Sequence, residues 1–406
     1  MFPAFSDSFL DTLVGGMLQP GWGTVAIYFL IATQITIFTV TLYLHRCAAH
    51  RGVDFHPVLT HFFRFWSWLT TSMITKEWAA IHRKHHAKCE TEEDPHSPMV
   101  KGIGTVFWRG AELYRQARRD RASIEQYGKG LPEDWIERHV YTPHATFGPT
   151  LLLFVLFALF GLKGVAAWAL QMCWIPFWAA GVINGLGHWW GYRNFETTDT
   201  ATNLSPWGVW IGGEELHNNH HAFPSSAKFA LRKWEFDIGW AAIRGLQALG
   251  LAKVLRVAPQ LDVRPNIPMP DTDTLKALLA LRFQAMTDYQ RKVVMPALRE
   301  EARLAGEKMR ALLPRRLRKG IVDDGRWLKP EARAQLQAWV DERPRIRTLI
   351  EYRARLSAVL EARSQSATDT LLALQQWCRE AEDSGIQALR EFSERMKGYA
   401  LQPARV

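Results

Sequence analysis

The sequence predicts an all-α fold: an integral-membrane helical bundle with a histidine-rich cytoplasmic cap and a charged C-terminal helical tail. Residues 22–44, 140–162 and 164–187 are uncharged apart from histidine, and each could cross a hydrocarbon core of about 30 Å as a helix. Histidines are clustered at the ends of apolar stretches. The net charge of +10 lies in the C-terminal part, because residues 241–406 hold 30 Lys and Arg against 20 Asp and Glu.

The charge pattern and the prolines divide the chain into four parts. We expect an N-terminal segment at 1–21, a membrane domain at 22–256, a linker at 257–270 and a helical tail at 271–406. The linker is rich in proline between Pro259 and Pro270. The tail carries leucines at helical spacing among many charges, which predicts several amphipathic helices of unknown role. Breaks are expected at Pro314, Pro330 and Pro344.

The flanks of the first apolar stretch predict its orientation. Asp7 and Asp11 precede it, and His45 and Arg46 follow it directly. Because Lys and Arg favour the cytoplasmic side, we place the N-terminus outside and the first histidines in the cytoplasm. The N-terminal residues before the stretch contain no Lys or Arg, so we expect no cleaved signal peptide. The predicted location is a bacterial inner (cytoplasmic) membrane, crossed several times, with a cytoplasmic C-terminus.

Eight of the fourteen histidines form three clusters. They are His45 and His50; His82, His85 and His86; and His217, His220 and His221. The i, i+3, i+4 spacing of the second and third clusters places the three imidazoles on one face of a helix. Imidazole binds iron, copper, nickel and zinc. Since one zinc ion takes three or four protein ligands, eight histidines predict a site for two metal ions.

Residues 55–75 resemble a further membrane span, interrupted only by Arg64. A full crossing would place His50 and His82 on opposite faces, about 30 Å apart. Crossing twice needs roughly 40 residues, and 31 lie between these two histidines. We therefore expect this segment to lie in the interface or to re-enter. The two later spans, joined by a tight turn, then return the chain to the face that it left.

The four cysteines include no C-x-x-C pair, which argues against a disulfide framework, a zinc ribbon and a fused iron–sulfur domain. An apolar substrate contains no polar bond that a hydrolytic zinc site could cleave. Clustered imidazoles beside membrane hydrocarbon therefore favour redox iron with dioxygen.

The residues around the clusters add further motifs. The second cluster is flanked by Glu77-Trp78 and Asp94-Pro95-His96. It is followed by Asn184-Gly185-Leu186-Gly187-His188 and Gly191-Tyr192-Arg193. The third cluster lies within Gly213 to Pro224 and is followed by Trp234-Glu235-Phe236-Asp237. In this order the chain resembles the integral-membrane fatty acid desaturases, above all their stearoyl-CoA (Δ9) branch. The resemblance covers roughly residues 24–241. Eukaryotic members have two membrane segments before the first histidine box, whereas this chain shows one clear span, so the number of segments before His45 stays open.

The resemblance implies a set of iron ligands. Two iron ions (Fe2+) would be held by His45, His50, His82, His85, His86, His188, His217, His220 and His221. Asn184 would lie near one iron, through water. We expect His96 to support the site or its loop rather than to bind metal. Glu214 and Glu215 would either hydrogen-bond to ligating imidazoles or face water.

The resemblance also implies a reaction. A cis double bond, at Δ9, would be inserted into a long-chain saturated acyl-CoA or acyl-lipid, with O2 as co-substrate and water as the other product. Trp78, Trp189 and Trp190 are expected to line the substrate channel. Two electrons per turnover would come from a separate donor, a ferredoxin, a rubredoxin or a cytochrome b5-type protein with its reductase, because the chain carries no motif for either cofactor.

Two other functions stay open. A membrane diiron hydroxylase of alkane, fatty acyl or sterol chains would use the same scaffold and yield an alcohol. A non-catalytic membrane protein with a tail that binds nucleic acid or partners would contain no iron. Residues 374–386 loosely resemble the C-terminal segments of some bacterial transposases, but no acidic triad accompanies them. We therefore do not expect nucleic acid as a partner.

Overall fold

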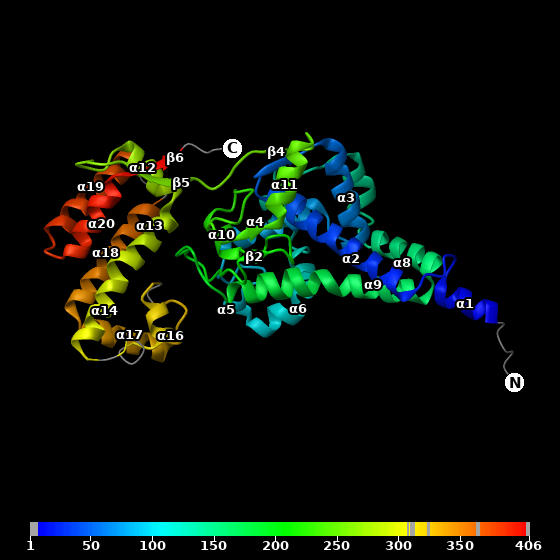
Figure 1. The fold of residues 1–406 in the computed structure, drawn as a ribbon, viewed down its shortest axis with the longest axis horizontal. Coiled ribbons are helices and arrows are strands. Elements are labelled where there is room, and N and C mark those ends of the chain that lie inside the picture. The colour runs from blue at the N-terminus through cyan, green and yellow to red at the C-terminus, as the bar shows by residue number, and fades with distance from the viewer. Residues whose placement is uncertain (1–6, 307, 309–312, 323–324, 363–365, 403–406) are drawn as a thin grey trace. The chain divides into compact units, whose positions relative to one another are not determined.

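The computed structural model describes the chain except residues 1–6, 307, 309–312, 323–324, 363–365 and 403–406 (Figure 1). The described chain is mostly helical, as predicted, with short strands in two-stranded sheets. It forms two compact units, Met1–Arg193 with Asp199–Ala258, and Asn194–Thr198 with Pro259–Val406.

Long apolar helices run side by side through the first unit (Figure 1). The first unit opens with α1 (Asp7–Gly15), α2 (Trp22–Phe38) and the π-helix η1 (Thr39–Ala49), and later contains α8 (Phe147–Phe160), α9 (Leu162–Ile175), the π-helix η3 (Pro176–Gly185) and the 3₁₀ turn η4 (Leu186–His188). Two continuous helices, Trp22–Ala49 and Leu162–His188, have the length and apolar composition to cross a membrane. They correspond to two of the three predicted spans.

The third predicted span, 140–162, is shorter than expected. Its regular helix begins only at Phe147 and has 14 residues, about 21 Å at 1.5 Å per residue. Pro143 follows the short π-helix η2 (Glu137–Tyr141) and has no backbone N–H to donate to a preceding carbonyl, and the regular helix begins four residues later. The backbone carbonyl of His144, beyond the proline, instead accepts a hydrogen bond from Trp68 Nε1 at 2.9 Å.

The turn between α8 and α9 depends on glycine. Gly161 has φ +60°, a left-handed conformation that glycine adopts without steric cost. At Gly164 a Cβ atom would lie 2.1 Å from the carbonyl oxygen of Leu156. The two helices therefore pack with their backbones in close approach, as the predicted tight turn requires.

Segment 55–75 brings the chain back beside the first histidine pair, as predicted. It forms α3 (Pro57–Thr71), which ends at the left-handed Ser72 before α4 (Thr75–Lys88). His50 Nε2, before this segment, lies 2.8 Å from His82 Nε2, after it. Arg64 is buried in α3 and forms ion pairs with Asp134 and Glu137.

The remaining elements of the first unit are short and surround the histidines. They are β1 (Val53–Phe55), α5 (Pro98–Lys101), α6 (Ile103–Ala117), α7 (Arg121–Tyr127), β2 (Trp207–Gly208), α10 (His217–Ala222), β3 (Phe236–Asp237), α11 (Ile238–Ala248) and β4 (Ala252–Val254). Strand β1 pairs antiparallel with β4, and β2 pairs parallel with β3. The β1–β4 pair joins the chain after the first histidine cluster to the chain after the third, and the β2–β3 pair joins the segments on either side of the third cluster.

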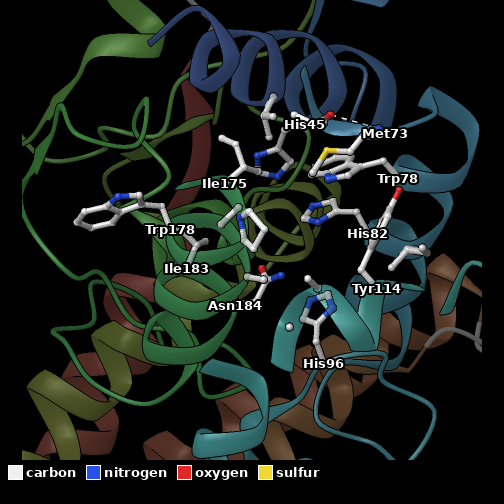
Figure 2. A pocket seen from close by; sticks show the side chains of 18 of the residues that line it. His45, Met73, Trp78, His82, His96, Tyr114, Ile175, Trp178, Ile183 and Asn184 are labelled. Carbon is white, nitrogen blue, oxygen red and sulfur yellow. Dashed lines mark hydrogen bonds between the residues drawn. The ribbon is translucent and has the colours of Figure 1, made fainter. Parts of the chain in front are cut away.

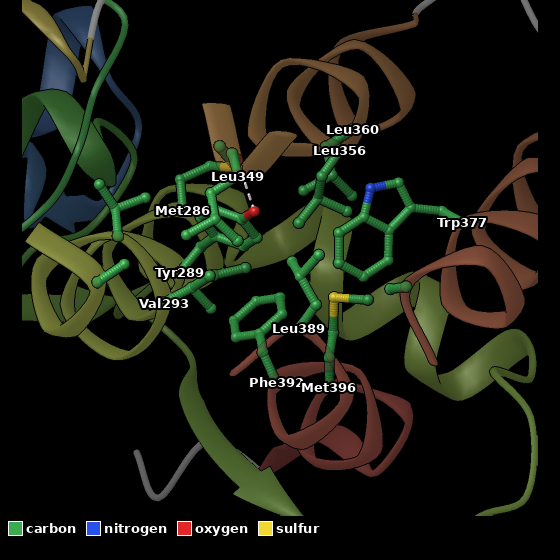
Figure 3. Packing of buried hydrophobic residues seen from close by; sticks show 14 of the residues in the cluster. Met286, Tyr289, Val293, Leu349, Leu356, Leu360, Trp377, Leu389, Phe392 and Met396 are labelled. Carbon is green, nitrogen blue, oxygen red and sulfur yellow. Dashed lines mark hydrogen bonds between the residues drawn. The ribbon is translucent and has the colours of Figure 1, made fainter. Parts of the chain in front are cut away.

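The second unit is a helical domain with its own core. It contains β5 (Gln260–Val263), α12 (Thr272–Ala280), α13 (Arg282–Tyr289), the π-helix η5 (Gln290–Val294), α14 (Met295–Leu304), α16 (Arg315–Gly320), α17 (Pro330–Asp341), α18 (Pro344–Glu361), α19 (Ala367–Asp383), α20 (Gln387–Lys397) and β6 (Tyr399–Gln402). Helices α16, α17 and α18 begin at or directly after the three prolines that were expected to mark breaks. Figure 3 shows Tyr289, Trp377 and Phe392 packed in the core with leucines from α18 and α20.

Residues 259–270 of the predicted linker belong to the second unit. Its strand β5 pairs antiparallel with β6 at the end of the described chain, with Leu261 opposite Leu401. Arg264 Nη2 donates to Asp271 Oδ1 at 2.7 Å and fixes the start of α12. Prolines, which cannot donate to a ladder, indicated an irregular segment here, but the strand begins directly after Pro259.

Candidate metal centre

All nine predicted ligand histidines lie in the first unit and converge on one region. Helix α4 carries His82, His85 and His86, α10 carries His217, His220 and His221, η1 carries His45 with His50 directly after it, and His188 ends η4. The five-residue spacing of the first pair fits a π-helix, in which hydrogen bonds run from i to i+5. The backbone N–H of His50 donates to the carbonyl of His45 at 3.1 Å. In an α-helix the same two side chains would diverge by about 140°.

Five imidazoles form what we call the first set. It consists of His45, His50, His82, His86 and His220, whose ligand nitrogens all lie within 4.8 Å of one another. The Nε2 atom of His220 lies 3.0 Å from that of His45 and 2.9 Å from that of His86. Imidazole nitrogen binds a first-row metal at about 2.0–2.1 Å, so two ligands at a right angle lie about 3 Å apart. The spacing in the first set therefore fits a single metal ion.

The second set lies beside the first. It contains His85, His188 and His221, whose ligand atoms lie within 4.8 Å of one another and of the Cys89 sulfur. His217 belongs with this set, because its Nε2 atom lies 2.9 Å from Nε2 of His188. Both sets are built from α4 and α10, and the structure thus places two groups of nitrogen donors next to each other.

Three buried carboxylates and the partly buried Asp199 orient these imidazoles through the opposite ring nitrogen. His45 Nδ1 lies 2.8 Å from Glu214, His85 Nδ1 3.0 Å from Asp94, His188 Nδ1 3.0 Å from Glu90, and His221 Nδ1 2.9 Å from Asp199. An ionised carboxylate only accepts hydrogen bonds, so Nδ1 carries the proton and donates it. The lone pair of Nε2 then points into the set, which is how ligating histidines are oriented in metal sites.

The carboxylates are themselves held in place. Glu214 accepts a hydrogen bond from Thr41 Oγ1 at 2.6 Å, and Asp94 accepts from the backbone N–H of Glu90 at 2.9 Å. Burial raises the pKa of the Asp94 carboxyl, but the charge and the hydrogen bond of His85 lower it more, and the net pKa lies well below the usual range. Asp94 is therefore ionised at neutral pH and fixes the tautomer of His85.

Most of the remaining imidazoles are neutral. Burial lowers the pKa of His82 and of His217 well below the usual value, and neighbouring histidines lower it further. Among the described residues, no hydrogen-bond partner lies at Nε2 of His221, although this atom is buried. A buried nitrogen without a partner costs free energy, which a bound metal ion would recover. The donor atoms of both sets therefore fit metal ions.

An apolar cavity of about 410 Å³ begins at the two sets. Figure 2 shows His45 and His82 at its wall, with Ile175, Ile183 and Trp178 on the other side. Its remaining wall comes mostly from η1, α4, α6, α9 and η3. A cavity lined mainly by apolar side chains beside metal ligands can hold a hydrocarbon chain close to the metals.

The predicted channel residues are only partly at this cavity. Trp78 lines it and stacks on His82 with 5.0 Å between the ring centroids, and Asn184 lines it as well (Figure 2). Trp189 and Trp190 are 53% and 66% exposed, and the described residues that line the cavity do not include them. They follow His188, whose side chain takes the inward position at the end of the helix, so their own side chains point outward.

Sequence reasoning left several supporting residues unassigned. Glu214 was expected either to bond to an imidazole or to face water, and the structure shows the bond to His45. Glu215 instead accepts the backbone N–H groups of its own loop. His96 stacks on His85, with 4.3 Å between the ring centroids. Glu90 and Asp199 were missed, since both lie in loops where spacing does not predict direction.

Replacing Asp94 tests the role of these carboxylates. Asp94→Asn keeps the size of the side chain but removes the charge that fixes His85, so the metal affinity of the second set should fall by about 10- to 100-fold. A competition titration against a chelator measures this affinity. Glu92→Gln, at an exposed carboxylate in the same loop, is the matched control and should bind like the parent. Equal affinities for both variants would contradict the orienting role.

Comparison with known proteins identifies the family. The fatty acid desaturase profile matches residues 20–241. Delta-9 acyl-lipid desaturase 1 of Arabidopsis thaliana is 33% identical over 220 residues, 52% of this chain and 69% of that protein. The sn-1 stearoyl-lipid 9-desaturase of Synechocystis sp. is 28% identical over 249 residues (59% and 74%), and the icosanoyl-CoA 5-desaturase of Limnanthes douglasii is 31% identical over 231 residues (55% and 63%). The matched region contains every histidine of both sets, and the chain therefore belongs to the fatty acid desaturase family, within which it is similar to Δ9 desaturases.

Proposed function

We propose that this protein is an O2-dependent diiron desaturase that inserts a cis double bond, at Δ9, into a long-chain saturated acyl group. The observation that carries the proposal is the apolar cavity that ends at two adjoining sets of imidazoles. Relatives named as Δ9 desaturases support the position of the bond. The proposed iron ligands are the nine histidines of the two sets, and Asn184, which lines the same cavity, is proposed to lie near one iron through water.

The residues of the chain would do the positioning. Two bound iron ions supply the chemistry that reduces O2 to water while two hydrogens leave adjacent carbons. An alkyl chain offers no polar group to recognise at those carbons, so the cavity wall must hold them in place. Trp78, stacked on His82, and Ile183 form part of that wall. Close packing of apolar side chains also excludes water from the reacting carbons.

The cavity has a cationic end that favours an anionic carrier. Arg115 is exposed and also lines the cavity, so the cavity reaches solvent near the C-terminal end of α6. Arg118 lines it too and pairs with the buried Glu77, which Arg121 also contacts at 3.0 Å. Guanidinium groups bind phosphate through paired hydrogen bonds. Both an acyl-CoA and a phospholipid carry phosphate next to a long acyl chain, and both are proposed as substrates.

The proposed setting is a membrane. The two long apolar helices would cross it, and the histidine sets would lie on the cytoplasmic side. A bacterial inner membrane and a cytoplasmic C-terminus are proposed on the same grounds. The electrons would come from a separate ferredoxin, rubredoxin or cytochrome b5-type protein.

Product analysis tests this function. The protein should be expressed in a host that makes no unsaturated long-chain fatty acids, and the fatty acid methyl esters and bound metal analysed. A desaturase yields a cis-Δ9 alkene and binds about two irons per chain, as the two sets predict. A hydroxylated product would identify the hydroxylase on the same scaffold. A membrane-inserted protein with neither iron nor product would support the non-catalytic alternative.

A further inference from the structure

We propose that Cys89 is a ligand of the second metal ion, which gives that ion mixed nitrogen and sulfur coordination. The proposal rests on the metal centre of the proposed function, although not on the reaction that it catalyses. Cys89 follows α4 directly and lies four residues after His85, so the two side chains leave the helix on the same side. Its sulfur lies 3.9 Å from Nε2 of His85.

The spacing of the donor atoms fits one shared ion. The sulfur of Cys89 and the ligand nitrogens of His85, His188 and His221 all lie within 4.8 Å of one another. With metal bonds of about 2.3 Å to sulfur and about 2.1 Å to nitrogen, two such ligands lie about 3.1 Å apart at a right angle and about 4.4 Å apart when opposite. The observed 3.9 Å separation falls between these limits.

A second observation points to a ligand at the same place. The buried Nε2 atom of His221 has no hydrogen-bond partner among the described residues, while its Nδ1 atom is engaged by Asp199. The orphan nitrogen and the sulfur therefore belong to one set of donors whose common partner would be the metal ion. The carboxylates of Asp94, Glu90 and Asp199 remain behind the imidazoles.

The coordination step is balanced by the loss of one proton. The thiol S–H bond breaks, the proton passes to solvent, and the thiolate forms a bond to the metal ion. No electron is transferred, and no oxidant is needed. A thiolate is a softer donor than imidazole. The ion of the second set would therefore have a softer set of ligands than the ion of the first set, which is surrounded by five histidines in the described structure.

The test uses the full-length protein loaded with Co2+. Thiolate coordination gives a sulfur-to-cobalt charge-transfer band in the near ultraviolet, which imidazole does not produce. The parent protein should show this band, and Cys89→Ser should lose it while retaining at least half of the bound cobalt. Cys173→Ser, at an exposed cysteine of α9, is the matched control and should keep the band unchanged.

Each other outcome has a definite meaning. Two results together overturn the sulfur ligand alone: the cobalt-loaded parent protein lacks the band, and the parent protein expressed in the host forms unsaturated product. A band that persists in Cys89→Ser also overturns it. Should Cys89→Ser fail to fold, X-ray absorption on the parent decides, since a sulfur neighbour at about 2.3 Å supports the ligand and its absence refutes it. A parent protein that binds no metal overturns the metal centre itself.

Discussion

His220→Ala should reduce the yield of unsaturated product below detection and lower the bound metal by about half or more. The Nε2 atom of His220 lies 3.0 Å from that of His45 on η1 and 2.9 Å from that of His86 on α4. Its removal takes from the first set the nitrogen that lies between His45 and His86. Methyl ester analysis and metal analysis of the membrane-purified protein measure both effects.

The control for this variant is another histidine. His139 is exposed and belongs to neither set, so His139→Ala should retain parental product and metal. Both variants should be recovered from the membrane fraction in similar amounts, which separates a lost ligand from a failed insertion. Full activity in His220→Ala would refute the proposed role of this residue.

Asp237→Asn should destabilise the first unit by about 3–5 kcal/mol. Arg46 is completely buried, and its guanidinium donates to both carboxylate oxygens of Asp237, at 2.9 and 3.0 Å. It also donates to the backbone carbonyls of Gly212 and Ala227 and stacks 3.8 Å over the ring of Phe229. The amide keeps the shape of the side chain but leaves the arginine charge buried without its counter-ion.

Denaturant unfolding in detergent, followed by tryptophan fluorescence, measures the loss. Arg46 follows His45 directly, so the same variant should also bind metal more weakly at the first set. Glu93→Gln removes the partner of an ion pair with Lys88 at the surface, where solvent screens the interaction. This control should unfold like the parent, and an Asp237→Asn protein of parental stability would show that the buried pair is dispensable.

Two of the histidine clusters could be predicted to share a helix face from their spacing, whereas the full set of nine came from the family resemblance. In α4 and α10 the i, i+3, i+4 pattern fixes a common face, and the structure brings those imidazoles together. In loops, the spacing of residues in the sequence does not determine where their side chains point. Glu90 and Asp199 therefore escaped prediction, and Trp189 and Trp190 were placed at the channel although their side chains face away from it.

Hydropathy predicted the long helices but not their exact extents. The 140–162 stretch is uncharged apart from His144, yet its regular helix begins only at Phe147, four residues after Pro143. The C-terminal residues were predicted as several charged amphipathic helices from their leucine spacing and charge. Their core depends on side chains distant in sequence, such as Tyr289, whose hydroxyl donates to the carbonyl of Leu349 at 2.7 Å. Such contacts have no local signature.

Helices α4 and α10 each contribute to both sets, and this arrangement couples the occupancy of the two metal positions. In α4, His82 and His86 belong to the first set and His85 to the second. In α10, His220 belongs to the first set, and His217 and His221 belong to the second. The first ion to arrive must fix both helices and bears the entropic cost of ordering them, so the next ion binds to a scaffold already rigid. If both sets bind metal as proposed, half-filled molecules should therefore be scarce when the metal is limiting, and the protein would be either fully loaded or empty.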